Sequence, residues 1–422
     1  MSSKSPSSSS GRYVSRLTSG TLAVIMAGGR GERLKQLTMH RAKPATPFGG
    51  KFRILDFVLS NCVNSGIRQI CVLTQYKAQT LIEHVQRGWG YLRGEFGEFI
   101  DVIPAQQQLG PHWYRGTADA VYQNLDYIRS HRPKHVLVLA GDHIYKMDYG
   151  PMIAYHVEKN ADITIGVVEV PREQAREYGV LSVTEWNRVV RFAEKPSEPE
   201  PVPGRPANAL ASMGIYVFNA RLLEQLLLAD AARADSQHDF GKNIIPESLA
   251  GLQVFTYAFE DVRTRAQAYW RDVGTLDAYY EANMELVHVH PELNIYDEEW
   301  PIWTYQLQRP PAKFVLDEDG RRGTAINSMT AGGCIISGAL VRESLLFSDV
   351  HVDERSVVYR SVLLPSVTVG RNCQIERAIV DEGCVVPDET VIGVDHAADA
   401  TRFEVTERGI VLVTAEMLKD LA

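Results

Sequence analysis

Apolar residues along the first 290 positions follow two different periods. Continuous apolar runs of strand length, typical of buried strands, occur at 21–26, 69–74 and 135–140. Apolar residues with the three- and four-residue spacing of a helix occur at 78–87, 118–129 and 275–288. Strands that alternate with helices in this way predict an α/β domain with a largely parallel sheet.

The period changes near Cys334. From there apolar residues, many of them β-branched, recur every five or six positions with short polar turns between them. They are Ile335, Val341, Phe347, Val352, Val357, Leu363, Val369, Ile375, Val380, Val386 and Ile392. Such a repeat predicts a parallel β-helix whose coils stack on one another. The irregular spacing leaves an ordinary β-sandwich as the alternative. Since a β-helix cannot close its own ends, we expect it to pack against the first domain or another subunit.

These patterns divide the chain into four parts. The serine-rich residues 1–19 have no apolar core and are expected to form a disordered tail. Residues 20–290 form the α/β domain, the proline- and tryptophan-containing segment 291–311 is a surface linker, and 312–422 form the β-helix. No apolar run approaches the ~18 residues of a membrane span.

Charge and cysteine content argue against two classes of protein, those that bind nucleic acids and those held together by disulfides. The net charge of −8 gives no support for nucleic-acid binding, so phosphate binding would depend on a few placed cations. The five cysteines contain no Cys-x-x-Cys pair, and their odd number argues against a disulfide framework. We interpret them as reduced packing residues of a cytoplasmic protein.

A glycine-rich loop follows the first strand. It reads Ala27-Gly28-Gly29-Arg30-Gly31 and is followed by Arg33 and Lys43. Without Cβ atoms the main chain can approach phosphate oxygens closely, and the basic residues add positive charge. The dinucleotide fingerprint would need glycine at Leu34, and the P-loop pattern occurs nowhere. The alternative is a glycine turn with surface arginines.

Two carboxylates are candidates for a metal site. Asp142 directly follows the third strand, where open α/β sheets bind their ligands, and Asp272 precedes a helix. Together they offer the oxygen ligands that Mg²⁺ prefers. Aspartate is also common as a turn residue after a strand. The motif Asp239-Phe240-Gly241 lacks the other motifs of a kinase and is expected only to start a helix.

Several motifs occur together in one order. They are Gly-Gly-x-Gly-x-Arg-Leu with Lys43-Pro44 following, Phe48–Arg53, Trp113–Ala120, Gly141–Tyr145, Glu194-Lys195-Pro196 and Tyr269–Gly274. From about Thr21 to the C-terminus the chain resembles the sugar-1-phosphate nucleotidyltransferases, and among these the bacterial glucose-1-phosphate adenylyltransferases. The resemblance implies a Rossmann-like catalytic domain and a left-handed β-helix for oligomerisation and regulation. It also implies transfer of AMP from ATP to glucose 1-phosphate, the committed step of bacterial glycogen synthesis, by a homotetramer.

The resemblance further implies roles for individual residues. Arg30, Lys43, Asp142 and Asp272 would be catalytic, with the two aspartates holding Mg²⁺. The residues that would bind ATP are Ala27, Gly28, Gly29, Gln75, Tyr114, Gly116 and Thr117. Those that would bind glucose 1-phosphate are Gly179, Glu194, Lys195 and Ser212.

An allosteric site is implied at His40, Arg41, Arg53 and Arg371, the last from the β-helix. Family members often have lysine or arginine where this chain has His40. Arginines bind phosphate through charge-assisted forked hydrogen bonds, whereas histidine is mostly neutral at pH 7.5. We therefore expect activation by a sugar monophosphate such as fructose 6-phosphate over fructose 1,6-bisphosphate, with AMP or phosphate inhibiting.

Three other functions compete with adenylyl transfer. The base preference rests on the resemblance alone, so a transferase using UTP or dTTP stays open. An acyltransferase in the β-helix would need a placed histidine base, but His351 and His396 lie in no recognisable acceptor motif. A non-catalytic paralogue should lack Arg30, Lys43, Asp142 or Lys195, and all four are present.

Overall fold

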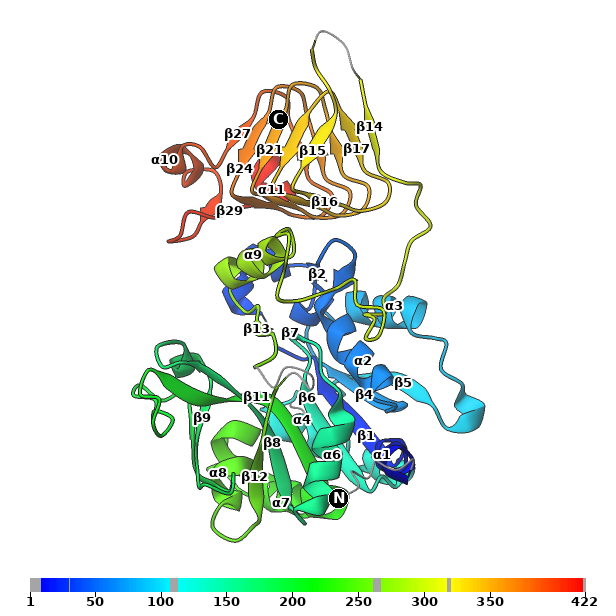
Figure 1. Ribbon diagram of the computed structural model, residues 1–422, viewed down its shortest axis with the longest axis vertical. Helices are drawn as coiled ribbons and strands as arrows, with labels where there is room; N and C mark the ends of the chain where they lie inside the picture. The colour runs from blue at the N-terminus through cyan, green and yellow to red at the C-terminus, as the bar shows by residue number, and fades with distance from the viewer. Residues whose placement is uncertain (1–8, 30, 107–112, 261–266, 317–319, 420–422) are drawn as a thin grey trace, which may run out of the picture.

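The computed structural model describes residues 9–29, 31–106, 113–260, 267–316 and 320–419. An α/β domain and a triangular β-helix lie one above the other, with α9 (Leu276–Glu285) between them (Figure 1). None of the helices in these ranges is long and apolar enough to cross a membrane.

The α/β domain is built on one large sheet in the order β10-β9-β11-β6-β1-β4-β5, with β8 joining β11 to β12. Its strands are β1 (Thr21–Met26), β4 (Gln69–Thr74), β5 (Phe99–Pro104), β6 (His135–Ala140), β8 (Ile163–Pro171), β9 (Gly179–Val183), β10 (Val189–Glu194), β11 (Asn208–Asn219) and β12 (Val254–Ala258). The neighbours β6, β1, β4 and β5 are parallel, which confirms the predicted sheet. Strand β11 then adds antiparallel pairs with β6, β8 and β9.

Helices cover both faces of this sheet (Figure 1). They are α2 (Ile54–Asn64), α3 (Ala78–Gly88), α4 (Thr117–Tyr122), α5 (Leu125–His131), α6 (Tyr149–Glu158), α7 (Ala220–Ala231) and α8 (Ile245–Ser248). Alternate residues of β1 enter two separate cores, Ala23 and Ile25 one and Leu22 and Val24 the other, because successive strand side chains point to opposite faces.

One predicted helix is divided. The segment 118–129 forms α4 and α5 with a break at Gln123 and Asn124. The side-chain amide of Asn124 donates to the carbonyl of Ala120 at 2.8 Å and to the Tyr114 hydroxyl at 2.9 Å. Such side-chain bonds to the backbone compete with the bonds of a continuous helix.

The expected disorder of residues 1–19 is wrong for its second half. Residues 1–8 lie outside the described ranges, but α1 (Ser9–Ser19) is a helix that packs on α6. Thr18 is buried and Leu17 packs against the core. Tertiary contact on one side of the segment therefore stabilises a helix that its serine-rich composition did not indicate.

The C-terminal domain has three sheets, which are parallel except for the last strand pair of the third. The first contains β14 (Lys313–Val315), β17 (Ile335–Ser337), β20 (His351–Val352), β23 (Thr368–Val369) and β26 (Val385–Val386). The second contains β15 (Thr324–Ile326), β18 (Leu340–Arg342), β21 (Val357–Tyr359), β24 (Gln374–Glu376) and β27 (Val391–Ile392). The third contains β16 (Met329–Thr330), β19 (Leu345–Leu346), β22 (Val362–Leu363), β25 (Ala378–Val380), β29 (Val411–Val413) and β28 (Glu404–Val405), and the short helices α10 (His396–Asp399) and α11 (Ala415–Leu418) follow the last coils.

Equivalent residues of successive coils stack in register. Ile336 pairs with Val352, Val352 with Val369, and Val369 with Val386, and all four are buried. This stacking confirms the predicted parallel β-helix and excludes the β-sandwich. The parallel sheets agree with the left-handed form that the resemblance implies.

The segment predicted as a linker lies against α2. The indole nitrogens of Trp300 and Trp303 donate to Asn61 and Asn64, each at 3.0 Å, and Ile302 is buried. Side chains of α9, of the segment after the glycine loop and of the β-helix form one apolar cluster. The two domains are therefore joined by a shared core as well as by the chain.

Candidate active site

The glycine loop lies at the carboxyl end of β1. Gly28 packs beside Gln75, which follows the neighbouring parallel strand β4, whereas a Cβ on Gly29 would meet no atom within 4 Å. Packing therefore does not require a glycine at position 29, and the surface above it is open to a ligand. Ala27 is tied to β4 by a hydrogen bond from its N–H to the Leu73 carbonyl at 2.8 Å. Arg30 lies outside the described residues.

A lysine lies between the two predicted metal ligands. Lys43 begins the 3₁₀ helix η2 (Lys43–Ala45), and its Nζ lies 2.7 Å from Asp142 Oδ2 and 3.0 Å from Asp272 Oδ1. The Arg33 guanidinium lies 3.3 Å from Asp272 Oδ2. Three segments far apart in sequence thus place two cations and two carboxylates together.

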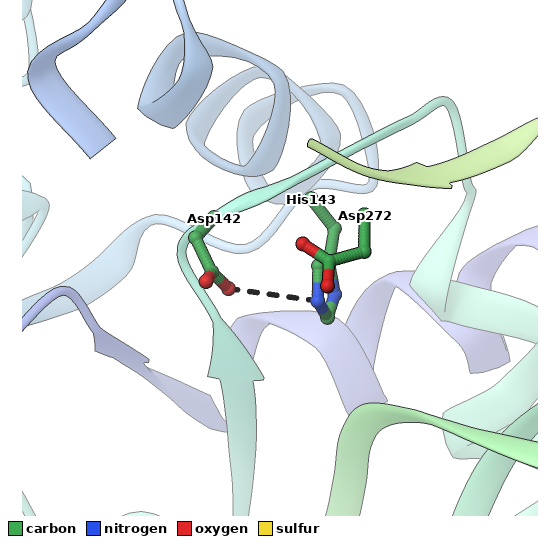
Figure 2. Close-up of side chains that lie close together, drawn as sticks. All are labelled: Asp142, His143 and Asp272. Carbon is green, nitrogen blue, oxygen red and sulfur yellow. Dashed lines mark ion pairs between the residues drawn. The ribbon is translucent and has the colours of Figure 1, made fainter. Parts of the chain in front are cut away.

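Strand pairing positions the two aspartates. The short strand β7 (His143–Tyr145) pairs antiparallel with β13 (Trp270–Asp272), so that His143 lies opposite Asp272 and directly after Asp142. Figure 2 shows the three side chains together, with Nε2 of His143 3.6 Å from Asp142 Oδ1. The His143 ring also packs edge to face on Trp270 at 5.0 Å.

The electrostatic balance favours ionised groups. Burial alone would lower the pKa of Lys43, but the carboxylates of Asp142 and Asp272 outweigh it and raise that pKa. Burial alone would raise the pKa of Asp142, but Lys43, His143 and Arg33 together hold it well below its usual range. The site therefore presents a carboxylate and an ammonium at neutral pH.

The chemistry of this group fits a divalent cation. One ligand atom each from Asp142, His143 and Asp272 lie within 4.8 Å of one another. The buried Nδ1 of His143 has no hydrogen-bond partner within the described ranges. We did not predict His143 from the sequence, although its place beside Asp142 could have indicated it.

The residues predicted to bind the sugar phosphate converge on one side of the sheet. Glu194 pairs with Gly179 between β10 and β9, and a Cβ on Gly179 would clash with Phe192. Lys195 follows directly with a φ of 47°. Ser212 lies at the β-bulge of β11 with its Oγ 3.3 Å from the Tyr216 hydroxyl. Burial, with a smaller effect from Asp239, raises the pKa of Glu194.

Two of the predicted nucleotide residues contact the segment that contains His238 and Asp239. The Thr117 hydroxyl donates to Asp239 Oδ2 at 2.9 Å, and a Cβ on Gly116 would clash with the backbone of His238. Asp239 also accepts from Gly241 N and Lys242 N at the start of a helical turn, as expected. The motif of Asp239 indicates only the start of a helix. The sequence did not indicate that this aspartate would contact Thr117 and, together with burial, also raise the pKa of Glu194.

The predicted allosteric residues are only partly brought together. Arg41 Nη1 lies 2.9 Å from Asp381 in the turn between β25 and β26, and His40 Nε2 lies 3.1 Å from Glu416. Arg53 is largely buried and donates to the Ala45 carbonyl. Arg371 lies in the turn between β23 and β24, a different corner of the β-helix from the one that faces Arg41. Because a β-helix turns a corner every few residues, the spacing in the sequence did not show at which corner Arg371 would lie.

Comparison with known proteins agrees with this arrangement. Residues 22–288 match the family model described as nucleotidyl transferase, and residues 310–413 match the one described as GlmU-like, C-terminal hexapeptide. Three proteins named glucose-1-phosphate adenylyltransferase, the third with the suffix 2, are similar over nearly their whole length. The one from Methylococcus capsulatus is 61% identical (97% of this chain, 96% of the relative), the one from Nitrosococcus oceani 60% (97% and 97%) and the one from Alkalilimnicola ehrlichii 59% (98% and 97%). The chain belongs to the glucose-1-phosphate adenylyltransferase family of nucleotidyl transferases.

Proposed function

We propose that this chain makes ADP-glucose and pyrophosphate from ATP and glucose 1-phosphate, as the committed step of bacterial glycogen synthesis. The similarity to the adenylyltransferases supports this activity. The observation that carries it is the position of Lys43 between Asp142 and Asp272, beside the open glycine loop. This arrangement gives a triphosphate both a backbone surface and placed positive charge.

The reaction requires positioning and charge stabilisation more than covalent help from the protein. A phosphate oxygen of glucose 1-phosphate attacks the α-phosphorus of ATP, a new P–O bond forms, and the bond to the leaving pyrophosphate breaks. Because the attacking phosphate is already ionised at neutral pH, no general base is needed. Lys43 and Arg30 stabilise the negative charge on the α-phosphate and the leaving group. Arg33, which contacts Asp272 together with Lys43, adds a further cation.

Asp142 and Asp272 are the residues that would hold Mg²⁺. The ion supplies positive charge to the reacting phosphates when bound. Lys43 contacts both carboxylates, so a bound cation would compete with its ammonium for them. His143 adds a neighbouring nitrogen donor.

Substrate binding is proposed on the two sides of this centre. Lys195 binds the phosphate of the sugar phosphate, Glu194 accepts hydrogen bonds from sugar hydroxyls, and Gly179 and Ser212 border the sugar. Ala27, Gly28 and Gly29 approach the nucleotide phosphates through their backbone. Gln75, Tyr114, Gly116 and Thr117 surround the adenine and ribose.

Regulation by sugar phosphates is proposed at the domain boundary. A groove of about 950 Å³ lies between the α/β domain, the linker and the β-helix, and Lys51, Arg53 and Trp303 are among its lining residues. The carboxylates of Asp381 and Glu382, which contact Arg41, would compete with an activator phosphate. AMP or phosphate is proposed to inhibit, and the resemblance supports a homotetramer.

The activity is tested by measuring pyrophosphate release over a matrix of nucleoside triphosphates and sugar 1-phosphates with Mg²⁺. We expect the highest kcat/KM for ATP with glucose 1-phosphate. A higher kcat/KM with UTP or dTTP would show that ATP is not the nucleotide donor. Absence of pyrophosphate release from every pair would favour a non-catalytic paralogue.

A further inference from the structure

The β-helix domain makes direct contact with the segment that carries the catalytic cations. We call residues 32–43 the cationic segment, since they hold Arg33 and Lys43. The segment begins with the helix η1 (Glu32–Thr38). Its Leu34 and Leu37 are buried in a cluster that includes Leu276 of α9 and Leu412 of β29. The catalytic cations are therefore supported partly by the C-terminal domain.

The backbone of this segment is strained at Lys35. This residue has φ 50° and ψ −131° inside η1, where the helix is kinked. Non-glycine residues rarely adopt such a conformation, and it persists only where the surroundings hold it. Thr38 stabilises one side of the kink, since its hydroxyl contacts the carbonyls of Gly31 at 2.9 Å and Lys35 at 3.2 Å.

A carboxylate of the β-helix domain holds the side chain of the same residue. The Lys35 ammonium forms an ion pair with Glu404, the first residue of β28. The hairpin β28–β29 that carries Glu404 is docked separately on α9. Thr406 Oγ1 donates to Asp277 at 2.6 Å, and Arg408 forms an ion pair with Glu281. The position of Glu404 is thus fixed by contacts other than the one to Lys35.

We propose that Glu404 is a positioning residue for adenylyl transfer, which acts through Lys35. By holding the ammonium of Lys35 it stabilises the kink, and the kink sets the directions in which Arg33 and Lys43 leave the segment. Without the ion pair the segment relaxes toward ordinary backbone conformations, and a smaller fraction of molecules has both cations in place. This inference rests on the proposed roles of Arg33 and Lys43.

The test compares two ion pairs of one hairpin. Glu404→Gln and Lys35→Met each remove the contact to the cationic segment, whereas Arg408→Gln removes only the contact to α9. Because the Lys35–Glu404 pair is partly exposed, with 46% and 27% of the side chains accessible, we expect kcat to fall about 2- to 5-fold in the first two variants. The KM for ATP should change less, and Arg408→Gln should retain wild-type kcat.

A charge exchange shows whether the pair itself matters. The double variant Lys35→Glu with Glu404→Lys keeps opposite charges at the same two positions, and we expect it to recover most of the lost kcat. A double variant no better than the single ones would overturn the proposal. So would an equal loss in Arg408→Gln, because docking of the hairpin alone would then explain the effect.

Hydrogen exchange measures the local stability of the cationic segment independently of enzyme activity. The amide of Met39 donates within the segment, to Gln36 at 3.0 Å, and that of Leu34 donates to Gly31, just before the segment, at 2.9 Å. Peptides covering 32–43 should exchange faster in Glu404→Gln than in wild type or Arg408→Gln. Unchanged exchange would refute the positioning role. Faster exchange in Glu404→Gln, combined with full activity of Lys43→Met, would instead show that the role given to Lys43 is wrong.

Discussion

Lys43 donates a hydrogen bond to Asp142 across 2.7 Å, although 99 positions separate them in the chain. The side chain of Lys43 is 7% exposed and that of Asp142 35%. Burial strengthens the interaction between their charges and makes an unpaired charge costly at this place. The pair therefore anchors the glycine-loop segment to the end of β6, where the reacting phosphates are proposed to bind.

Replacing Asp142 tests the proposed metal ligand. Asp142→Asn keeps the shape and removes the charge, so we expect kcat to fall about 10²- to 10³-fold, or about 3–4 kcal/mol of transition-state stabilisation. Steady-state kinetics at saturating Mg²⁺ measure this loss. Asp126→Asn, at an almost fully exposed carboxylate, is the matched control and should be unaffected. Wild-type kcat in Asp142→Asn would remove Asp142 from the mechanism.

Lys195 is predicted to contribute to substrate binding rather than to the chemical step. Lys195→Gln should raise the KM for glucose 1-phosphate, while kcat and the KM for ATP stay nearly constant. Arg191→Gln is a suitable control, because Arg191 lies on β10, the strand that directly precedes Lys195, and pairs with Glu200. An equal loss of kcat would show that Lys195 stabilises the transition state. Unchanged kinetics would show that it is only a surface lysine.

Two buried histidines predict loss of stability in acid. Burial, reinforced by His135, lowers the pKa of His156 from 6.5 to about 4. The unfolded chain therefore takes up this proton near pH 6.5 and the folded chain only near pH 4, so the free energy of unfolding falls as the pH drops through this window. Between pH 7.5 and 5 this residue should account for about 2 kcal/mol.

Urea unfolding of wild type and His156→Gln at these two pH values measures the contribution. The variant should lose about 2 kcal/mol less on acidification than wild type, whereas the exposed-site control His288→Gln should behave like wild type. An equal loss in all three proteins would show that His156 titrates normally in the folded state.

His40 is predicted to set the preference among activators. Histidine lacks the flexible ammonium with three donors that lysine offers to a second phosphate, so wild type should respond more to fructose 6-phosphate than to fructose 1,6-bisphosphate. In His40→Lys the response to the bisphosphate should increase. Activation by both compounds, measured at pH 6.5 and 8.0 in both proteins, tests this expectation. A wild type that responds to no sugar phosphate at either pH would refute it.

The sequence by itself determined the elements whose pattern is local. The apolar runs of β1, β4 and β6 and the five- and six-residue repeat of the β-helix are set by which side chains face a core. The structure confirms the runs and most of the repeat, but Ile336 and Val358 face the core in place of the predicted Ile335 and Val357. The motifs around Gly28, Asp142 and Lys195 also indicated the family, because each places chemically specific residues within a few positions of a strand end.

Tertiary structure decided what depends on contacts between distant segments. The helix α1 forms because Leu17 and Thr18 pack against the domain, and Arg371 lies at its own corner of the β-helix, away from the one that faces Arg41. No local pattern indicated that Lys43 would contact Asp272, or that Glu404 would hold Lys35 from the other domain. The pairing of β13 with β7 brings Asp272 to Lys43, and the packing of α9 and the β-helix on the catalytic domain brings Glu404 to Lys35. Because each pair is separated by hundreds of residues, no local pattern could place its charges within hydrogen-bonding distance.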